Sequence, residues 1–227
     1  KITNEKQTDL FFSSKGHDAP AIYSIMAIFE LIEFDKIHSL RRLNGLPGHP
    51  DIETDGIITN TGSLGMGISK AKGFIQSSRL KGINRNVFVL LGDGELQEGQ
   101  IWESLRSASN DRMGELYIIV DNNKIQSDNW VELTSHNDNL TRKFESFGCK
   151  VAEINGHDFS EIQYTFENLQ QINDKPKVII ANTIKGNGVS FMHADSNIRE
   201  SDYEYPYHSG ALNNEEYFMA LDELILT

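Results

Sequence analysis

Short apolar runs rich in β-branched residues alternate with helical stretches through most of the chain, and this alternation constrains the fold more than any other feature. Strands are predicted at 86–91, 115–120, near 145–154 and 177–183. Helices are predicted between them, over 100–110 and after a cap at Asp158 or Ser160. Strands and helices in alternation predict an α/β fold, in which a mostly parallel sheet carries helices on both faces.

The earlier part of the chain adds two predicted helices. Residues 20–33 are apolar over nearly the whole helical circumference, as in a helix buried between other elements. Residues 63–80 begin with closely spaced glycines, which predicts a tight loop opening into a closely packed helix. We find no internal repeat, low-complexity tract or linker, so a single domain is expected over 1–227, with 193–210 as an ordered surface loop.

Composition excludes several classes of protein. The 227 residues include 21 Lys and Arg against 33 Asp and Glu, a net charge of −12, which argues against a general nucleic-acid binder. The single cysteine, Cys149, allows no internal disulfide and suggests a reducing compartment. No apolar run approaches the roughly 20 residues of a membrane span, and no leader is recognisable. We therefore expect a cytoplasmic protein without membrane partners.

Polar residues follow two successive predicted strands. Gly92-Asp93-Gly94 ends one strand, and Asn122-Asn123 ends the next. Neighbouring parallel strands place such ends side by side, at the edge where ligands of these sheets bind. A carboxylate and an amide oxygen there, with a carbonyl such as that of Ile125, form an oxygen-only set suited to Mg²⁺, and flanking glycines allow a diphosphate to approach. A Gly-Asp-Gly segment alone could equally be a turn that ends a strand.

The segments around this pair resemble those of the transketolase family. In chain order they are Ser14-Lys15-Gly16-His17, Pro47-Gly48-His49-Pro50, Thr61 to Gly67, Gly92 to Glu103, Asn155 to Asp158 and Thr183 to Met192. Gly92 through Asn123 has the form of the thiamine diphosphate motif, and the resemblance covers about residues 8–220. It implies the thiamine-diphosphate-binding fold, and within it the domain that holds the cofactor's diphosphate.

The resemblance implies a role for each matching residue. Asp93, Asn123 and the carbonyl of Ile125 would bind the Mg²⁺ that bridges to the diphosphate. The residues expected to line the cofactor's diphosphate and thiazolium ring are His17, Gly62, Leu64, Gly92, Gly94 and His208. Singly, His17 could be a helix cap or a core residue; within the ordered set the cofactor role is favoured.

Three further residues are implied to take part in catalysis. His49 and His208 would face the substrate and move protons from its hydroxyl groups, a task that suits histidine because its pKa lies near neutrality. Glu98 would join an acidic hydrogen-bonded network across a subunit interface. Lys185, in a glycine-flanked loop, could reach a phosphate or could equally be solvated.

Three features depart from the family pattern. No segment before Thr8 resembles the SGHPGGS-like turn that transketolases carry near their start. Ser127 stands where many relatives place an apolar residue near the thiazolium ring, and the 193–207 loop is longer and more acidic than the family pattern.

The resemblance also implies a second chain. Transketolases need a pyrimidine-binding domain, and residues after 220 leave no room for one. We therefore expect the diphosphate-binding subunit of a two-chain transketolase, an α2β2 heterotetramer that moves a two-carbon ketol unit from a ketose, phosphorylated or not, to an aldehyde. The alternatives are the alpha subunit of a 2-oxo-acid dehydrogenase or decarboxylase, and a non-catalytic cofactor-binding subunit.

Overall fold

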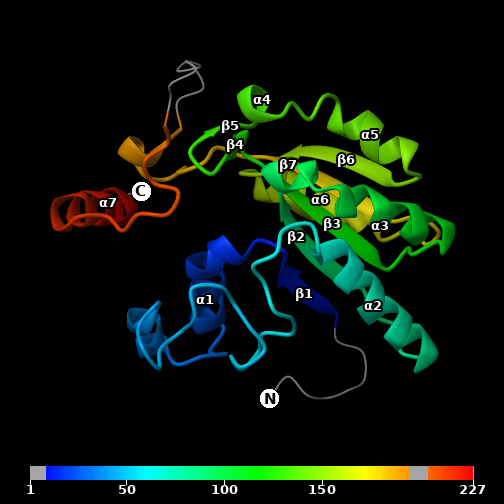
Figure 1. Ribbon diagram of the computed structural model, residues 1–227, viewed down its shortest axis with the longest axis horizontal. Helices are drawn as coiled ribbons and strands as arrows, with labels where there is room; N and C mark the ends of the chain where they lie inside the picture. The colour runs from blue at the N-terminus through cyan, green and yellow to red at the C-terminus, as the bar shows by residue number, and fades with distance from the viewer. Residues whose placement is uncertain (1–8, 195–203, 227) are drawn as a thin grey trace.

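The computed structural model describes residues 9–194 and 204–226 and is built around a five-stranded parallel sheet (Figure 1). The strands, in spatial order, are β1 (Leu10–Ser13), β2 (Val87–Gly92), β3 (Leu116–Asn122), β7 (Lys177–Asn182) and β6 (Lys150–Asn155). Every neighbouring pair within this sheet is parallel. The predicted α/β architecture is confirmed.

Helices cover both faces of the sheet. One face packs against α2 (Gly67–Leu80), α3 (Gly99–Asn110) and α5 (Leu140–Ser146), and the other packs against α6 (Phe159–Leu169). The side chains of successive residues in a strand point to opposite faces of the sheet. Val89 and Leu91 of β2 join the larger core, whereas Phe88 stacks on Tyr117 on the α6 side, with ring centroids 4.5 Å apart. Burial on both faces explains why the central strands β2, β3 and β7 are largely apolar.

The carboxyl ends of β2 and β3 lie side by side. In their register Gly92 is opposite Asp121, so the residues that follow each strand meet at one edge of the sheet. The 3₁₀ turn η3 (Gly94–Gln97) follows β2 and leads into α3. This adjacency is the one that the alternating pattern predicts.

The N-terminal part differs from the prediction in one helix. After β1 come the 3₁₀ turn η1 (Gly16–Asp18), α1 (Ala19–Ile28) and the 3₁₀ segment η2 (Phe34–Ser39). The expected helix over 20–33 was too long, because Glu30 adopts φ 57° in the left-handed region, where a right-handed helix cannot continue. Tyr23 and Met26 of α1 form a separate small core with Leu46.

Four short elements and one longer helix in the second half of the chain were not expected from the sequence. They are the hairpin β4 (Ile125–Gln126) and β5 (Asn129–Trp130), α4 (Val131–Thr134), η4 (Ser190–Met192) and α7 (Asn214–Leu226). The strand predicted near 145–154 begins later, at Lys150, because residues 145–146 belong to α5. Most of the 193–207 loop lies outside the described residues. Within the described part of the chain, every helix is too short or too polar to cross a bilayer.

Candidate active site

Asp93 is a buried carboxylate at the end of β2. It is 2% exposed, and its two oxygens accept hydrogen bonds from backbone N–H groups, one from Gly94 at 2.7 Å and the other from Lys124. Its own carbonyl accepts from the Asn137 amide at 2.8 Å. Burial raises the pKa of Asp93 to about 6, against the opposing effect of these backbone donors. The side chain is therefore held rigidly between the two strand ends.

Asn123 lies beside it on the loop that leaves β3. Its amide nitrogen donates to Asp121 at 3.0 Å, which fixes the orientation of the amide group, and its oxygen accepts from the N–H of Ile125 at 3.0 Å. Lys124, between these two residues, adopts φ 72° in the left-handed region. The loop therefore turns sharply enough for its backbone to reach Asp93.

The oxygen atoms of Asp93, Asn123 and Ile125 are suited to bind a magnesium ion. Among residues 9–194 and 204–226, Asp93 forms no ion pair, so its buried charge there is offset by backbone donors and by the more distant charge of Lys124. Carboxylate, amide and carbonyl oxygens are the ligand types that Mg²⁺ prefers, and each retains a free lone pair beyond the hydrogen bonds described. No cluster of three or more His, Cys, Asp or Glu ligands occurs within that same part of the chain. An ion here would take part of its shell from a bound phosphate.

A cavity of about 260 Å³ gathers most of the predicted site residues. The predicted residues that line it are His17, Leu64, Gly92, Asp93, Gly94, Glu98, Asn123, Ile125 and His208. At Gly94 an added Cβ would lie 2.5 Å from the Cβ of Gln126, so only glycine allows this close approach of two backbones. The structure thus brings together residues spread from position 17 to position 208.

Two predicted residues, His49 and Gly62, do not line this cavity. They lie next to it: an added Cβ at Gly16 would clash with the His49 ring, and one at Gly62 would lie 3.9 Å from the same ring. Gly62 adopts φ 122°, a conformation suited to glycine. His49 is exposed, packed against the segment that carries His17.

His17 and His208 meet at the mouth of the cavity, with ring centroids 5.1 Å apart. Although His17 is exposed as a whole residue, protein atoms surround enough of its imidazole that burial, followed by the nearby His208, lowers its pKa to about 4. Burial and then the charge of Lys185 lower the pKa of His208 as well. Both imidazoles are thus held neutral near pH 7.

Lys185 is the cation of this group. Its ammonium lies 2.9 Å from Nδ1 of His208, and burial lowers its pKa to about 8. A second cavity of about 400 Å³ continues from it, lined by Lys185 together with His157 and Asn187. Sequence reasoning left Lys185 undecided between phosphate contact and solvation; the structure places it half-buried at the site, against His208.

Sequence reasoning missed several other residues of the site. Lys15 pairs with Asp121 at 2.8 Å, and Asp121 also accepts a hydrogen bond from Thr183 at 2.5 Å. Burial raises the pKa of Asp121, but the charge and hydrogen bond of Lys15 outweigh it and hold that pKa below its usual value. Glu95 is 3% exposed at the base of the cavity. All of these residues stand inside or beside the segments that resemble the transketolase family. That position was the only sign in the sequence that they belong to the site.

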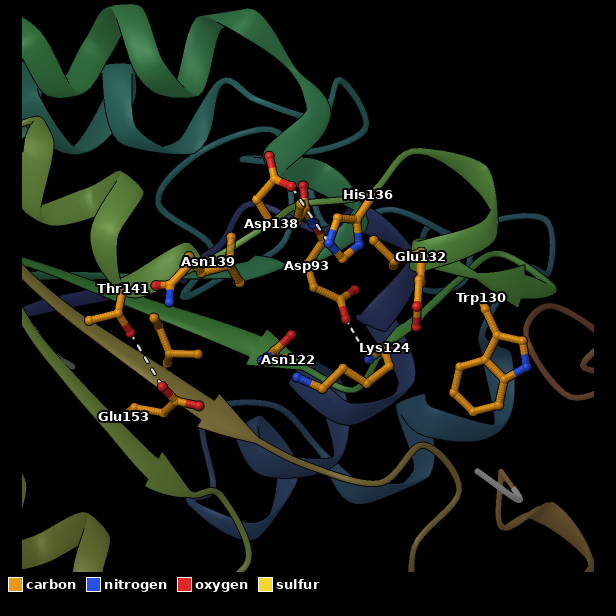
Figure 2. A pocket seen from close by; sticks show the side chains of 14 residues that line it. Asp93, Asn122, Lys124, Trp130, Glu132, His136, Asp138, Asn139, Thr141 and Glu153 are labelled. Carbon is orange, nitrogen blue, oxygen red and sulfur yellow. Dashed lines mark hydrogen bonds and ion pairs between the residues drawn. The ribbon is translucent and has the colours of Figure 1, made fainter. Parts of the chain in front are cut away.

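Asp93 also lines a neighbouring cavity of about 350 Å³ (Figure 2). Figure 2 shows its carboxylate pointing toward Lys124, with Asn122 below and His136 beside it. His136 and Asp138 form an exposed pair at 3.6 Å at the rim. Asp93 is the only predicted site residue among those that line this cavity.

Comparison with known proteins places this geometry in a family. The family model for the transketolase thiamine diphosphate binding domain matches residues 3–202. The chain belongs to the transketolase family. Its fold agrees with that of the solved transketolase of Campylobacter jejuni, with a TM-score of 0.83 and 29% identity over 95% of this chain and 34% of that one.

Shorter transketolase subunits are similar over nearly the whole chain. One belongs to the apulose-4-phosphate transketolase of Actinobacillus succinogenes and is 36% identical over 96% of this chain and 76% of that protein. Another is the 6-deoxy-6-sulfo-D-fructose transketolase subunit SqwG of a Clostridium species, 34% identical over 96% of this chain and 77% of that protein. The chain thus spans about a third of the solved transketolase and about three quarters of these subunits.

Proposed function

We propose that this chain is the diphosphate-binding subunit of a two-chain transketolase. With a pyrimidine-binding partner, thiamine diphosphate and Mg²⁺, it transfers a two-carbon ketol unit from a ketose or ketose phosphate to an aldehyde. The observation that carries the proposal is the meeting of Asp93 and the Asn123 loop at adjacent strand ends, in a chain that matches transketolase subunits over almost its whole length.

The roles of the residues follow from their positions. Asp93, Asn123 and the Ile125 carbonyl would hold Mg²⁺, and Gly94 lines the same cavity, where the diphosphate would lie. His17 lines the diphosphate, and Leu64, which is 36% exposed at the cavity, offers an apolar surface to the thiazolium ring. The cofactor, when bound, supplies the carbanion-stabilising chemistry.

Proton movement is assigned to the histidines. His208 is held neutral, so its free Nε2 can carry the hydrogen and donate it to a substrate or diphosphate oxygen. His49 stands at the exposed side of the Gly16 segment, where an arriving sugar hydroxyl can reach it. Glu98 is exposed at the start of α3, as a residue that meets a partner chain must be.

Large apolar side chains on two helices favour a partner chain. Ile28 and Phe29 at the end of α1 are 73% and 70% exposed, and Phe218 and Ile225 of α7 are 61% and 71% exposed. Large exposed apolar surfaces mark sites of protein interaction, and these side chains would supply such a surface. We propose an α2β2 assembly that acts in the cytoplasm, where the buried Cys149 stays reduced.

The test is a reconstitution. The chain alone, with thiamine diphosphate and Mg²⁺, is expected to show no ketol transfer, and the complex with its pyrimidine-binding partner is expected to turn over at least one member of a panel of ketoses and ketose phosphates. Robust turnover by the single chain would overturn the two-chain assignment. Decarboxylation of a 2-oxo acid without ketol transfer would favour the dehydrogenase alternative, and cofactor binding without any turnover would favour a non-catalytic subunit.

A further inference from the structure

Glu95 is a buried carboxylate that the roles above leave unused. It stands in η3, two residues after Asp93, and is 3% exposed. It lines the same cavity as the candidate cofactor residues. It forms no ion pair within the described residues; hydrogen-bond donors meet its charge, with a longer-range contribution from the charge of Lys15.

Those donors come from three segments that are far apart in sequence. Oε1 accepts from the hydroxyl of Ser14 and from the N–H of Gly65 at 2.8 Å, and Oε2 accepts from the N–H of Gly92 at 3.2 Å. The Ser14 oxygen in turn accepts from the N–H of Gly67 at 3.1 Å. One carboxylate therefore joins the end of β1, the 62–67 loop and the end of β2.

Each of these segments also carries a candidate cofactor residue. Ser14 stands three residues before His17, Gly65 follows Leu64, and Gly92 precedes Asp93. The positions of those residues relative to one another consequently depend on the Glu95 hydrogen bonds.

The 62–67 loop fits closely against its neighbours. Gly65 adopts φ 82°, and an added Cβ there would lie 2.7 Å from the Cβ of Glu98. An added Cβ at Gly67 would lie 2.5 Å from that of Ser14. Gly65 and Gly67 have no side chains that could hold the loop by packing. The hydrogen bonds donated by their N–H groups must therefore fix the position of the loop, and Glu95 and Ser14 accept these hydrogen bonds.

We propose that Glu95 is a positioning residue that holds the His17, Leu64 and Asp93 segments at the spacing required by the cofactor's diphosphate. This inference rests on the proposed function. Both carboxylate oxygens of Glu95 are engaged in the three acceptor contacts to protein groups, so the loss of Glu95 is expected to act through the placement of the other residues.

Glu95→Gln is the sharpest variant, because the amide keeps the size of the side chain but replaces one acceptor oxygen with a donor. An NH₂ group would then face an N–H or O–H donor, leaving at least one of them unpaired in a buried place. Glu103→Gln is the matched control, since Glu103 is an exposed carboxylate on the following helix, α3.

The experiment uses the full chain with the partner that co-purifies with it and measures the dissociation constant of thiamine diphosphate with Mg²⁺ by calorimetry. Hydrogen exchange of the 62–67 amides is measured without cofactor. Glu95→Gln is expected to weaken cofactor binding at least tenfold and to speed exchange of the Gly65 and Gly67 amides, with unchanged helix content; Glu103→Gln is expected to match the wild type.

The outcomes separate this inference from the proposed function. Wild-type protein that does not bind thiamine diphosphate would overturn both. Wild-type binding together with equal binding by Glu95→Gln, even if that variant melts at a lower temperature, would overturn only the positioning role. If Glu95→Gln does not fold, Ser14→Ala removes one of the three contacts and leaves the carboxylate; unchanged affinity in Ser14→Ala would then overturn the inference.

Discussion

The ammonium of Lys185 lies 2.9 Å from Nδ1 of His208, and this contact fixes the tautomer of the histidine. An ammonium group can only donate hydrogen bonds, so Nδ1 must be the unprotonated acceptor, and the hydrogen of the neutral ring sits on Nε2. The ring that meets His17 at the cavity mouth is thus prepared to donate a proton from Nε2.

Replacing Lys185 tests the effect of its charge on His208. In Lys185→Met the long apolar stem remains but the charge is lost, so the pKa of His208 is expected to rise toward its ordinary value, while the effect of burial persists. An NMR titration of the imidazole resonances measures the change. Lys81→Met, at an exposed lysine beyond α2, serves as the control. A His208 pKa that stays the same in Lys185→Met would argue against the contact.

Asp121 is expected to govern magnesium affinity without touching the ion. It accepts the amide N–H of Asn123 at 3.0 Å and so turns the oxygen of that amide away from itself, while Lys15 holds the carboxylate at 2.8 Å. Asp121→Asn breaks the ion pair and allows the amide to flip. Loss of such an orienting partner typically weakens metal binding about 10–100-fold. Titration of Mg²⁺ in the presence of thiamine diphosphate checks this, with the exposed Asp174→Asn as the control. Equal affinities in the two variants would refute the orienting role.

His17 is expected to make stability depend on pH in the acid range. Its pKa is about 4 in the folded chain against 6.5 as the ordinary value, so between these limits the unfolded chain binds the proton more readily. The contribution of His17 to the free energy of unfolding should therefore fall as the pH drops from about 6.5 toward 4, while Asp93, whose pKa is raised to about 6, acts in the opposite direction. The slope of stability against pH should accordingly be smaller in His17→Gln than in the wild type. Urea unfolding at a series of pH values measures both slopes, and coinciding slopes would show that His17 does not titrate in this way.

The sequence was sufficient to predict four of the five strands, and it placed the carboxyl ends of β2 and β3 side by side. The runs at 86–91 and 115–120 appear as β2 and β3, and Gly92 lies opposite Asp121 because parallel neighbours bring like ends together. β1 escaped prediction because four residues, Leu10–Ser13, show no period that separates a strand from a loop. The length of α1 was overestimated because apolar periodicity does not reveal the left-handed residue Glu30 that ends it.

The site was only partly predictable for a related reason. A motif identifies which residues stand together in sequence but not which way each side chain faces. Glu95 could have been a solvated charge in a turn, and its burial depends on Gly65 and Gly92 arriving from other segments. Lys185, on the loop that follows β7, contacts His208, which stands 23 residues later in the chain. Such long-range contacts leave no local signal in the chain.

Lys177 offers a stability test remote from the site. It is 2% exposed, its ammonium donates to the Tyr117 hydroxyl at 3.0 Å and lies 4.1 Å from that ring centroid, and burial lowers its pKa to about 8 from 10.5. Between these values the unfolded chain holds the proton and the folded chain does not, so stability should rise with pH, by at most about 3 kcal/mol over the full window. Measurements stay below about pH 9.5. Burial raises the pKa of Tyr117, so the ionisation of its hydroxyl would make stability fall as the pH rises, opposite to the effect of Lys177. Lys177→Met should reduce the rise and leave the share of Lys185, whose pKa burial also lowers to about 8, whereas Lys150→Met, at the exposed lysine opposite Lys177 on β6, should retain the full rise. Denaturant unfolding of the three proteins is measured at pH 7 to 9.5, and an undiminished rise in Lys177→Met would mean that another group is responsible.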